Sequence, residues 1–115
     1  MRVLVVEDDI VTGADIFAQL AQWGYRCDGP HQTSEKALRA LERQLPDVGI
    51  LDYDLGHGDT TRLVAARLSK AGIPIIWLTG YLGTEISEMV GLEPEHVLEK
   101  PVLGTQLKKS LDRVR

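Results

Sequence analysis

Four short apolar runs of this sequence each end in polar residues that can take part in phosphate or metal chemistry. The residues that follow the runs are Glu7-Asp8-Asp9, Asp52-Tyr53-Asp54, Thr79-Gly80-Tyr81 and Lys100-Pro101. Carboxylates from two runs repel one another unless a cation joins them, and oxygen ligands without His or Cys suit Mg²⁺. A lysine ammonium and a threonine hydroxyl can meet phosphoryl oxygens, and an Asp can become an aspartyl phosphate. The set therefore suits magnesium-dependent phosphoryl transfer.

The apolar runs are the expected strands of one parallel sheet. Apolar and β-branched stretches predict strands at residues 3–6, 48–51, 73–78 and 96–99, and residues 25–30 fit a second strand by spacing although their pattern is weak. Helical periodicity predicts helices at 10–23, 33–45, 59–71, 84–90 and 103–114. This alternation predicts an α/β fold, (βα)5, in which a doubly wound five-stranded sheet carries helices on both faces and residues 1–115 form one domain. Ligands of such sheets bind beyond the carboxyl ends of the strands.

Apolar spacing also predicts the face that each helix buries. For the first helix the predicted inward residues are Ile10, Ala14, Phe17 and Ala21. For the second, capped by Thr33 or Ser34, they are Ala37, Leu38, Leu41 and Leu45. For the third they are Leu63, Val64, Leu68 and Ala71. In the last helix, Leu107 and Leu111 fit either the core or a homodimer face, and both alternatives stay open.

Composition argues against several function classes. The chain has 115 residues, a net charge of −4 and a 43% hydrophobic fraction, which is sufficient for a core. The acidic balance argues against binding to nucleic acid, which requires clustered Lys and Arg. No apolar run approaches the roughly 20 residues of a membrane span. The single cysteine, Cys27, cannot form an internal disulfide or a thiolate metal site, and it fits a cytoplasmic protein.

The net charge has a location in the sequence. It equals the summed charge of six residues at or beside the strand ends, and the remaining acids and bases cancel. These six residues are Glu7, Asp8, Asp9, Asp52, Asp54 and Lys100.

Taken together, these segments resemble the receiver domains of bacterial two-component response regulators over essentially the whole chain. The resemblance is carried by Val3-Leu4-Val5-Val6-Glu7-Asp8-Asp9, Asp47-Val48-Gly49-Ile50-Leu51-Asp52-Tyr53-Asp54-Leu55, Ile75-Ile76-Trp77-Leu78-Thr79-Gly80 and Leu98-Glu99-Lys100-Pro101. Any one segment is a weak signal, but four in order at the family's spacing are a strong one. The resemblance implies a flavodoxin-like, CheY-like fold.

The resemblance also implies the partners of the phosphoryl group. Asp52 would accept it from a histidine kinase or a histidine phosphotransfer protein, and Thr79 and Lys100 would contact it. The peptide bond between Lys100 and Pro101 is usually cis in the family. Self-catalysed phosphoryl transfer and slow autodephosphorylation are expected, so the chain is not an enzyme in the usual sense.

A metal site follows from the same resemblance. Glu7 and Asp8 match the acidic pair that holds Mg²⁺ or Mn²⁺ together with Asp52, and Asp8 is favoured over Glu7 as a direct ligand. Asp54 matches the position whose backbone carbonyl binds the ion. Asp9 is instead interpreted as a helix-start residue.

One residue departs from the common pattern of the family, and two segments indicate a subgroup within it. Val97 stands where the family often has Tyr or Phe as a rotameric switch, which puts the usual relay to the output face in doubt. The segments Gly56-His57-Gly58-Asp59 and Leu78-Thr79-Gly80-Tyr81 look most like receivers that occur alone or joined to histidine kinases. The prediction is therefore a switch for an unknown downstream protein, without a DNA-binding output domain in this chain.

Other interpretations of the same residues remain. The pair Asp52-x-Asp54 resembles the nucleophile and acid of haloacid-dehalogenase-like phosphatases, although their motif follows the first strand. A Toprim-type nuclease site also combines Glu with Asp-x-Asp, but it would leave Lys100 without a role. A degenerate receiver would only bind a partner. His31, His57 and His96 lack the spacing of metal ligands, and Tyr81 fits either the rim of the site or an exposed position.

Overall fold

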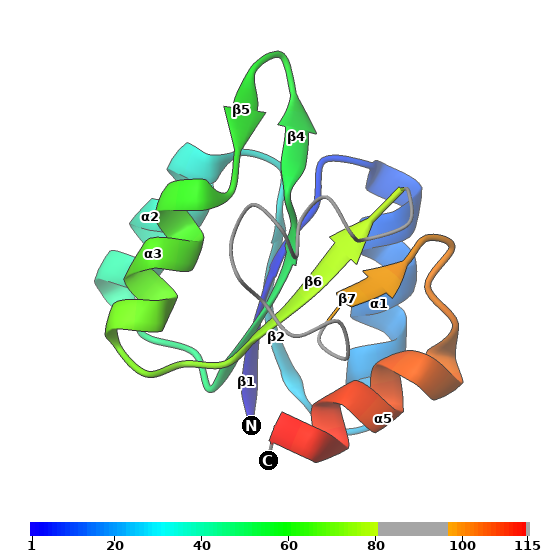
Figure 1. The fold of residues 1–115 in the computed structure, drawn as a ribbon. Coiled ribbons are helices and arrows are strands. Elements are labelled where there is room, and N and C mark those ends of the chain that lie inside the picture. The colour runs from blue at the N-terminus through cyan, green and yellow to red at the C-terminus, as the bar shows by residue number, and fades with distance from the viewer. Residues whose placement is uncertain (81–96, 115) are drawn as a thin grey trace.

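The central element of the molecule is a five-stranded parallel sheet. The computed structural model describes residues 1–80 and 97–114, and within them the strand order is β2-β1-β3-β6-β7 (Figure 1). The strands are β1 (Arg2–Val6), β2 (Arg26–His31), β3 (Val48–Asp52), β6 (Ile75–Thr79) and β7 (Val97–Glu99). This order is the flavodoxin-like one, in which the chain winds outward in both directions from β1 and β3. The predicted fold class is therefore confirmed.

Helices cover both faces of the sheet. They are α1 (Ile10–Gln22), α2 (Ser34–Arg43), α3 (Arg62–Lys70) and α5 (Gly104–Val114). Helices α2 and α3 lie on one face, and α1 and α5 lie on the other (Figure 1). In the described ranges no helix has the length and apolar character needed to cross a membrane. The predicted helix at 84–90, Tyr81 and His96 lie outside the described residues.

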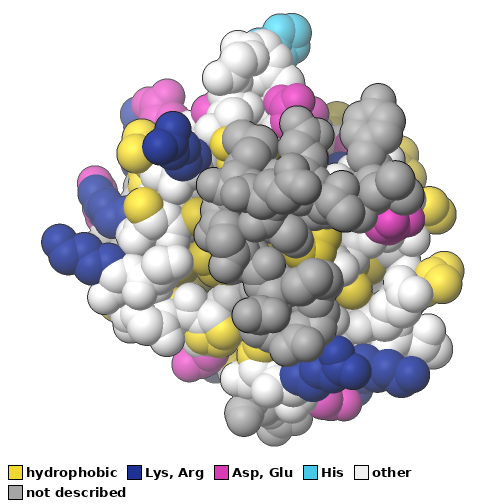
Figure 2. Space-filling view, viewed as in Figure 1, with side chains coloured by type: hydrophobic (Ala, Val, Ile, Leu, Met, Phe, Trp, Pro, Cys, Tyr) yellow, Lys and Arg dark blue, Asp and Glu magenta, His cyan; other side chains and the backbone are white. Residues whose placement is uncertain are grey.

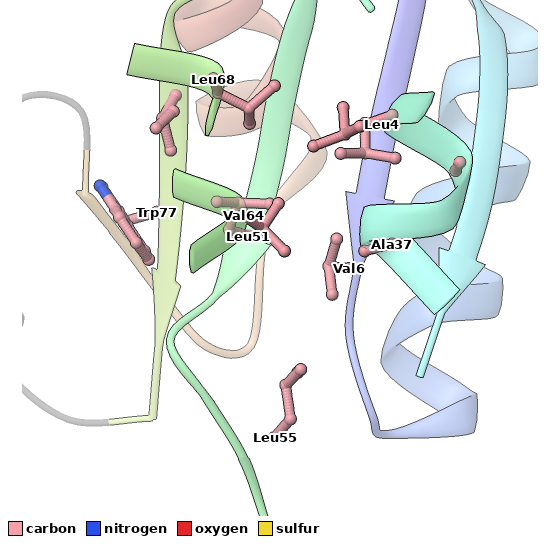
Figure 3. Packing of buried hydrophobic residues seen from close by; sticks show 11 residues of the cluster. Leu4, Val6, Ala37, Leu51, Leu55, Val64, Leu68 and Trp77 are labelled. Carbon is pink, nitrogen blue, oxygen red and sulfur yellow. The ribbon is translucent and has the colours of Figure 1, made fainter. Parts of the chain in front are cut away.

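The face under α2 and α3 buries one half of the core. Side chains of Leu4, Val6 and Leu51 from the sheet meet Ala37 of α2, and Trp77 is fully buried in the same cluster (Figure 3). The Thr33 side chain accepts a hydrogen bond from Lys36 N at 3.2 Å, so the predicted cap of α2 is confirmed. The predicted inward position of Leu45 is wrong, because α2 ends two residues earlier and the side chain is exposed.

The face under α1 and α5 buries the other half. Val3, Val5 and Ile50 of the sheet form one cluster with fully buried Leu107 and Leu111 of α5. Of the two alternatives for these leucines, the structure therefore selects the core.

The predicted inward face of α1 is wrong. Its buried residues are Gly13, Ile16 and Leu20, whereas Ile10 and Phe17 are exposed, as are Ala14 and Ala21. A side chain at Gly13 would come within 3.0 Å of Pro30, so α1 meets β2 closely on this side. Apolar residues occur on two faces of α1, and this close approach fixes the helix rotation, which periodicity alone does not.

The predicted start of the third helix is also wrong. Residues 54–60 instead form an antiparallel hairpin of β4 (Asp54–Gly56) and β5 (Asp59–Thr60), and α3 begins only at Arg62. The hairpin rises from the carboxyl end of β3, with a histidine at its outer end (Figures 1 and 2). Gly56, His57 and Gly58 have φ angles of 82°, 53° and 77°, and this left-handed run makes the turn.

This shorter α3 has a narrower buried face than predicted. Val64 and Leu68 are fully buried, as expected. Leu63 is 66% exposed, and Ala71 is exposed beyond the last helical residue. Ala71 leaves the buried face because α3 ends at Lys70, and the face of α3 toward the sheet is formed by Val64 and Leu68.

Candidate functional site

The predicted site residues converge at the carboxyl edge of the sheet. Asp52 is the last residue of β3, and Thr79 is the last residue of β6. Glu7 directly follows β1 in the sequence, and Lys100 directly follows β7. Parallel strands end at the same edge, so side chains far apart in the sequence meet there.

Three carboxylates form an acidic cluster at this edge. Glu7, Asp8 and Asp52 each offer one oxygen, and these atoms all lie within 4.8 Å of one another. Glu7 and Asp52 are buried, whereas Asp8 is exposed. Like charges so close in a partly dry site disfavour full ionisation, and a divalent cation would relieve this. The cluster can therefore hold a metal ion.

Glu7 is the member of the cluster most affected by its surroundings. Burial first, and then the nearby Asp52, raise the pKa of its carboxyl to about 8, although Lys100 acts in the opposite direction. Its Oε2 atom is buried with no hydrogen-bond partner among the described residues. A buried carboxyl oxygen without a hydrogen-bond partner, on a residue grouped with two other carboxyl groups, is compatible with a cation ligand set.

Lys100 links the two buried carboxylates. Its Nζ donates a hydrogen bond to Asp52 Oδ2 at 2.9 Å and forms an ion pair with Glu7 Oε1 at 2.5 Å. Burial alone would lower the pKa of Lys100, but the contacts with Glu7 and Asp52 outweigh it and raise the pKa. The ammonium is therefore a permanent positive charge against Asp52.

The edge is also fixed through the backbone of Lys100. Its N–H donates to the carbonyl of Thr79 at 2.8 Å, which ties the ends of β6 and β7 together. The peptide bond between Lys100 and Pro101 is cis, as the resemblance implied. Thr79 itself is buried at the end of β6.

Two acidic residues beside the cluster have local roles. Asp9 is the N-cap of α1 and accepts a hydrogen bond from Thr12 N at 3.3 Å, so its interpretation as a helix-start residue is confirmed. Asp54 begins β4, and its Oδ1 accepts a hydrogen bond from Gly56 N at 2.9 Å. The Asp54 side chain thus holds the hairpin turn.

The other singled-out side chains lie apart from the cluster. His31 Nε2 pairs with Asp28 Oδ1 at 2.9 Å, and within residues 1–80 and 97–114 no histidine joins a group able to hold a metal. Cys27 is half-buried, and burial raises the pKa of its thiol to about 11, which makes it unreactive at neutral pH.

Sequence reasoning missed two residues next to the site. Thr61 Oγ1 donates a hydrogen bond to the backbone carbonyl of Asp52 at 2.9 Å. Asp59 accepts hydrogen bonds from the backbone N–H and the hydroxyl of Ser34, which joins the hairpin to the first turn of α2. A Thr before an apolar helical pattern is an N-cap signal, so the helix start was detectable at residue 61. The partners of Thr61 and Asp59 were not.

Known proteins with similar sequences are transcriptional regulators. The virulence transcriptional regulatory protein PhoP of Salmonella typhimurium is 34% identical over 84 residues, which cover 72% of this chain and 37% of that protein. The chain thus spans little more than a third of the length of the curated relatives it matches first. No family model matches the chain.

Solved structures with the same fold match almost the whole chain. The signal receiver domain of a modulated diguanylate cyclase from Desulfovibrio desulfuricans is 29% identical with a TM-score of 0.82, covering 98% of this chain and 91% of that one. A response regulator receiver protein from Burkholderia phymatum is 25% identical with a TM-score of 0.82, covering 98% and 93%. The sequence comparison and the structural comparison therefore both indicate response regulators.

Proposed function

This chain belongs to the receiver domains of response regulators, and from that premise we propose that it is a phosphorylation switch in which Asp52 accepts the phosphoryl group. One observation carries the proposal. The Asp52 carboxylate ends a buried strand, is hydrogen-bonded to Lys100 at 2.9 Å and lies within 4.8 Å of two other carboxylates. Such a setting positions a nucleophilic oxygen and neutralises phosphoryl charge.

The proposed donor is the phosphohistidine of a histidine kinase or a histidine phosphotransfer protein. A carboxylate oxygen of Asp52 attacks phosphorus, the new O–P bond forms, and the P–N bond breaks. Its electron pair returns to the imidazole nitrogen. The Lys100 ammonium would move its contact from Asp52 to a phosphoryl oxygen. The Thr79 hydroxyl would donate a hydrogen bond to another phosphoryl oxygen. Water later cleaves the aspartyl phosphate slowly, so net turnover of phosphate esters is not expected.

We propose Mg²⁺, or Mn²⁺ in its place, as the resident ion. Asp8, Asp52 and the backbone carbonyl of Asp54 would hold it, and Glu7 would complete the acidic set around it. The ion would supply charge neutralisation at the phosphoryl oxygens. Supporting this, the described ligand candidates are all oxygen atoms, which Mg²⁺ prefers.

The exposed face of α1 is the proposed docking surface for the phosphodonor protein. Ile10 is 72% exposed and Phe17 46% exposed. Apolar side chains lie along the right edge of the molecule, the side on which α1 lies (Figures 1 and 2). Ile10 and Phe17 line a groove of about 320 Å³ together with Pro30 and the site residue Glu7. A protein that delivers a phosphoryl group must cover the site, and this groove lies next to it, at Glu7 and Asp9.

Two phosphodonors separate docking from chemistry. With Phe17→Ala, transfer from the cognate phosphohistidine protein should slow about tenfold, since interface aromatics often carry more than 1 kcal/mol. Phosphorylation by a small acyl phosphate should not change. Leu45→Ala, an exposed apolar residue after α2, is the matched control. Equal slowing with both donors, or none with the protein donor, would contradict this surface.

The downstream contact belongs to the same proposal. Val97 is half-buried and lies beside Trp77 in the sheet register. Because valine has no aromatic ring, the rotation of an aromatic side chain cannot transmit the signal at this position. We expect the phosphorylated state to bind an unknown downstream protein in the cytoplasm. A homodimer of this chain is one form that such a contact can take. Binding to nucleic acid or membrane is not part of the proposal.

Phosphotransfer profiling tests the function itself. Each histidine kinase of the host is autophosphorylated with labelled ATP and mixed with the chain in the presence of Mg²⁺. Label should move rapidly from one kinase to the wild-type chain and not to Asp52→Asn. Transfer of equal label to both proteins would exclude Asp52 as the acceptor, and sustained release of phosphate from esters would favour the phosphatase interpretation.

A further inference from the structure

Thr61 is a buried polar residue that the phosphorylation scheme above does not use. It is fully buried at the N-cap of α3. Its hydroxyl donates to the carbonyl oxygen of Asp52 at 2.9 Å, and its backbone N–H donates to the carbonyl of Tyr53 at 3.0 Å. Two consecutive carbonyls of the acceptor segment are therefore held by one residue.

The hydroxyl of Thr61 is not used in the way its position suggests. An N-cap Thr normally accepts a hydrogen bond from an N–H in the first turn of its helix. Thr33 does this for α2, where it accepts from Lys36 N. Thr61 makes no such bond to α3. Its hydroxyl points back to β3 instead. Helix α3 therefore lacks a side-chain capping bond, and the backbone of Asp52 has an additional hydrogen bond.

Burial makes this hydrogen bond restrictive. The Thr61 hydroxyl has no access to water, so breaking the bond would leave it without a hydrogen-bond partner. The Asp52 carbonyl would lose a partner at the same time. The bond also closes the hairpin, because it joins the end of β3 to the residue that follows β5. The backbone that directly follows the Asp52 side chain, from the Asp52 carbonyl to the Tyr53 carbonyl, is thereby fixed relative to α3.

We propose that Thr61 is a positioning residue for phosphoryl transfer, whose hydroxyl holds the Asp52–Tyr53 backbone so that the Asp52 carboxylate meets the incoming phosphorus in line. The inference rests on the proposed function of Asp52. Thr61 touches neither the phosphoryl group nor the ion, and acts only through the peptide it holds. Small misplacements of a nucleophile are costly in such reactions because positioning supplies much of the rate.

Matched substitutions test this role. Thr61→Val keeps the shape and removes the donor, whereas Thr61→Ser keeps the donor. Thr33→Val removes the other N-cap hydroxyl, away from Asp52, and controls for a general loss of stability. The rate constant of phosphorylation by a small acyl phosphate is measured at saturating Mg²⁺, with each variant confirmed as folded at the assay temperature.

The expected rates separate positioning from stability. Thr61→Val should be phosphorylated about tenfold or more slowly, whereas Thr61→Ser should stay within about twofold of wild type. Thr33→Val should lose stability and keep the wild-type rate. If Thr61→Val does not fold, Thr61→Cys replaces it, since a thiol is a weaker donor of similar size and should give an intermediate rate.

Failure of this inference is distinct from failure of the proposed function. A wild-type chain that is not phosphorylated would remove the function, and the inference with it. A phosphorylated wild type whose Thr61→Val or Thr61→Cys variant reacts equally fast would overturn the positioning role alone. Equal slowing by Thr33→Val would likewise overturn it, because stability would then explain the effect.

Discussion

At the residue scale, Glu7 has the most unusual chemistry of the site. Its pKa is raised from an ordinary value of 4.5 to about 8, first by burial and then by Asp52. In the metal-free protein, protonated Glu7 therefore favours the folded state below the unfolded pKa, and this contribution is lost as the pH rises through about 8. A bound cation reverses the preference, because it binds the ionised form.

Magnesium affinity should consequently rise with pH. Between about pH 6 and about pH 8 the dissociation constant should fall by up to about tenfold per pH unit, because each ion displaces the Glu7 proton. Above the pKa the curve should flatten. Isothermal titration calorimetry in buffers of different ionisation enthalpy measures both the affinity and the proton released.

Glu7→Gln is the control for this titration. It keeps the shape and removes the ionisable group, so its magnesium affinity should be weaker and nearly independent of pH over the same range. A wild-type affinity with no pH dependence, or a Glu7→Gln variant with the same slope as wild type, would contradict the role assigned to Glu7.

Residue types at strand ends explain which site residues were predictable. Glu7, Asp52, Thr79 and Lys100 each follow or end an apolar run, so their convergence follows from parallel strands alone. Thr61 was not predictable, because its partner is a backbone carbonyl nine residues away in the sequence. No pattern of side-chain types records a bond of that kind.

At the element scale, helix α1 shows the limit of periodicity. Adjacent residues differ sharply in it, since Ile16 is buried and Phe17 is exposed. Ile16→Ala should lower the free energy of unfolding by about 2–4 kcal/mol, because it opens a cavity against the sheet. Phe17→Ala should change it by less than about 1 kcal/mol. Urea denaturation measures both, and a larger loss for Phe17→Ala than for Ile16→Ala would show that the predicted face was the buried one.

The carboxylate of Asp59 joins the hairpin to helix α2. Asp59 accepts from the N–H and hydroxyl of Ser34, and these bonds lower its pKa. Asp59→Ala should cost about 1 kcal/mol of stability, comparable to the loss of a helix N-cap. Since its pKa is lowered on folding, this contribution is present at neutral pH and disappears as the pH falls through the folded pKa.

Denaturation at two pH values checks the role of Asp59. The difference between wild type and Asp59→Ala should be present at neutral pH and shrink in acid. Asp59→Asn, which keeps an acceptor oxygen, should retain part of the stability. A difference that grows in acid would show that the carboxylate is not the stabilising form.

At the scale of the whole molecule, strand spacing was sufficient to predict the fold. Four apolar runs and a weaker segment at residues 25–30, at similar intervals, leave few arrangements other than a doubly wound sheet, because crossovers are right-handed and short. Helix rotation and the hairpin were not predictable, since they depend on contacts such as Gly13 with Pro30 and on left-handed φ angles at residues 56–58. Global architecture thus followed from periodicity, whereas local orientation followed from packing.

The concentration of charge at one edge predicts a global effect of magnesium. At an ion concentration of about 100 times the dissociation constant, Mg²⁺ should stabilise the fold by about 2.7 kcal/mol. Asp8→Asn should abolish most of this gain. Asp9→Asn makes the same charge change one residue away and retains the capping oxygen of α1, so it should keep the gain. Equal gains in Asp8→Asn and Asp9→Asn would place the ion elsewhere.

The central claim is that Asp52 is the phosphoryl acceptor, and intact-mass spectrometry tests it most directly. The folded chain is incubated with a small acyl phosphate and Mg²⁺ and measured before hydrolysis. Wild type should gain the mass of one phosphoryl group, and so should Asp54→Asn, whose exposed side chain is not required. Asp52→Asn should gain none. A folded wild type without added mass, or an Asp52→Asn variant that gains the same mass as wild type, would contradict the account.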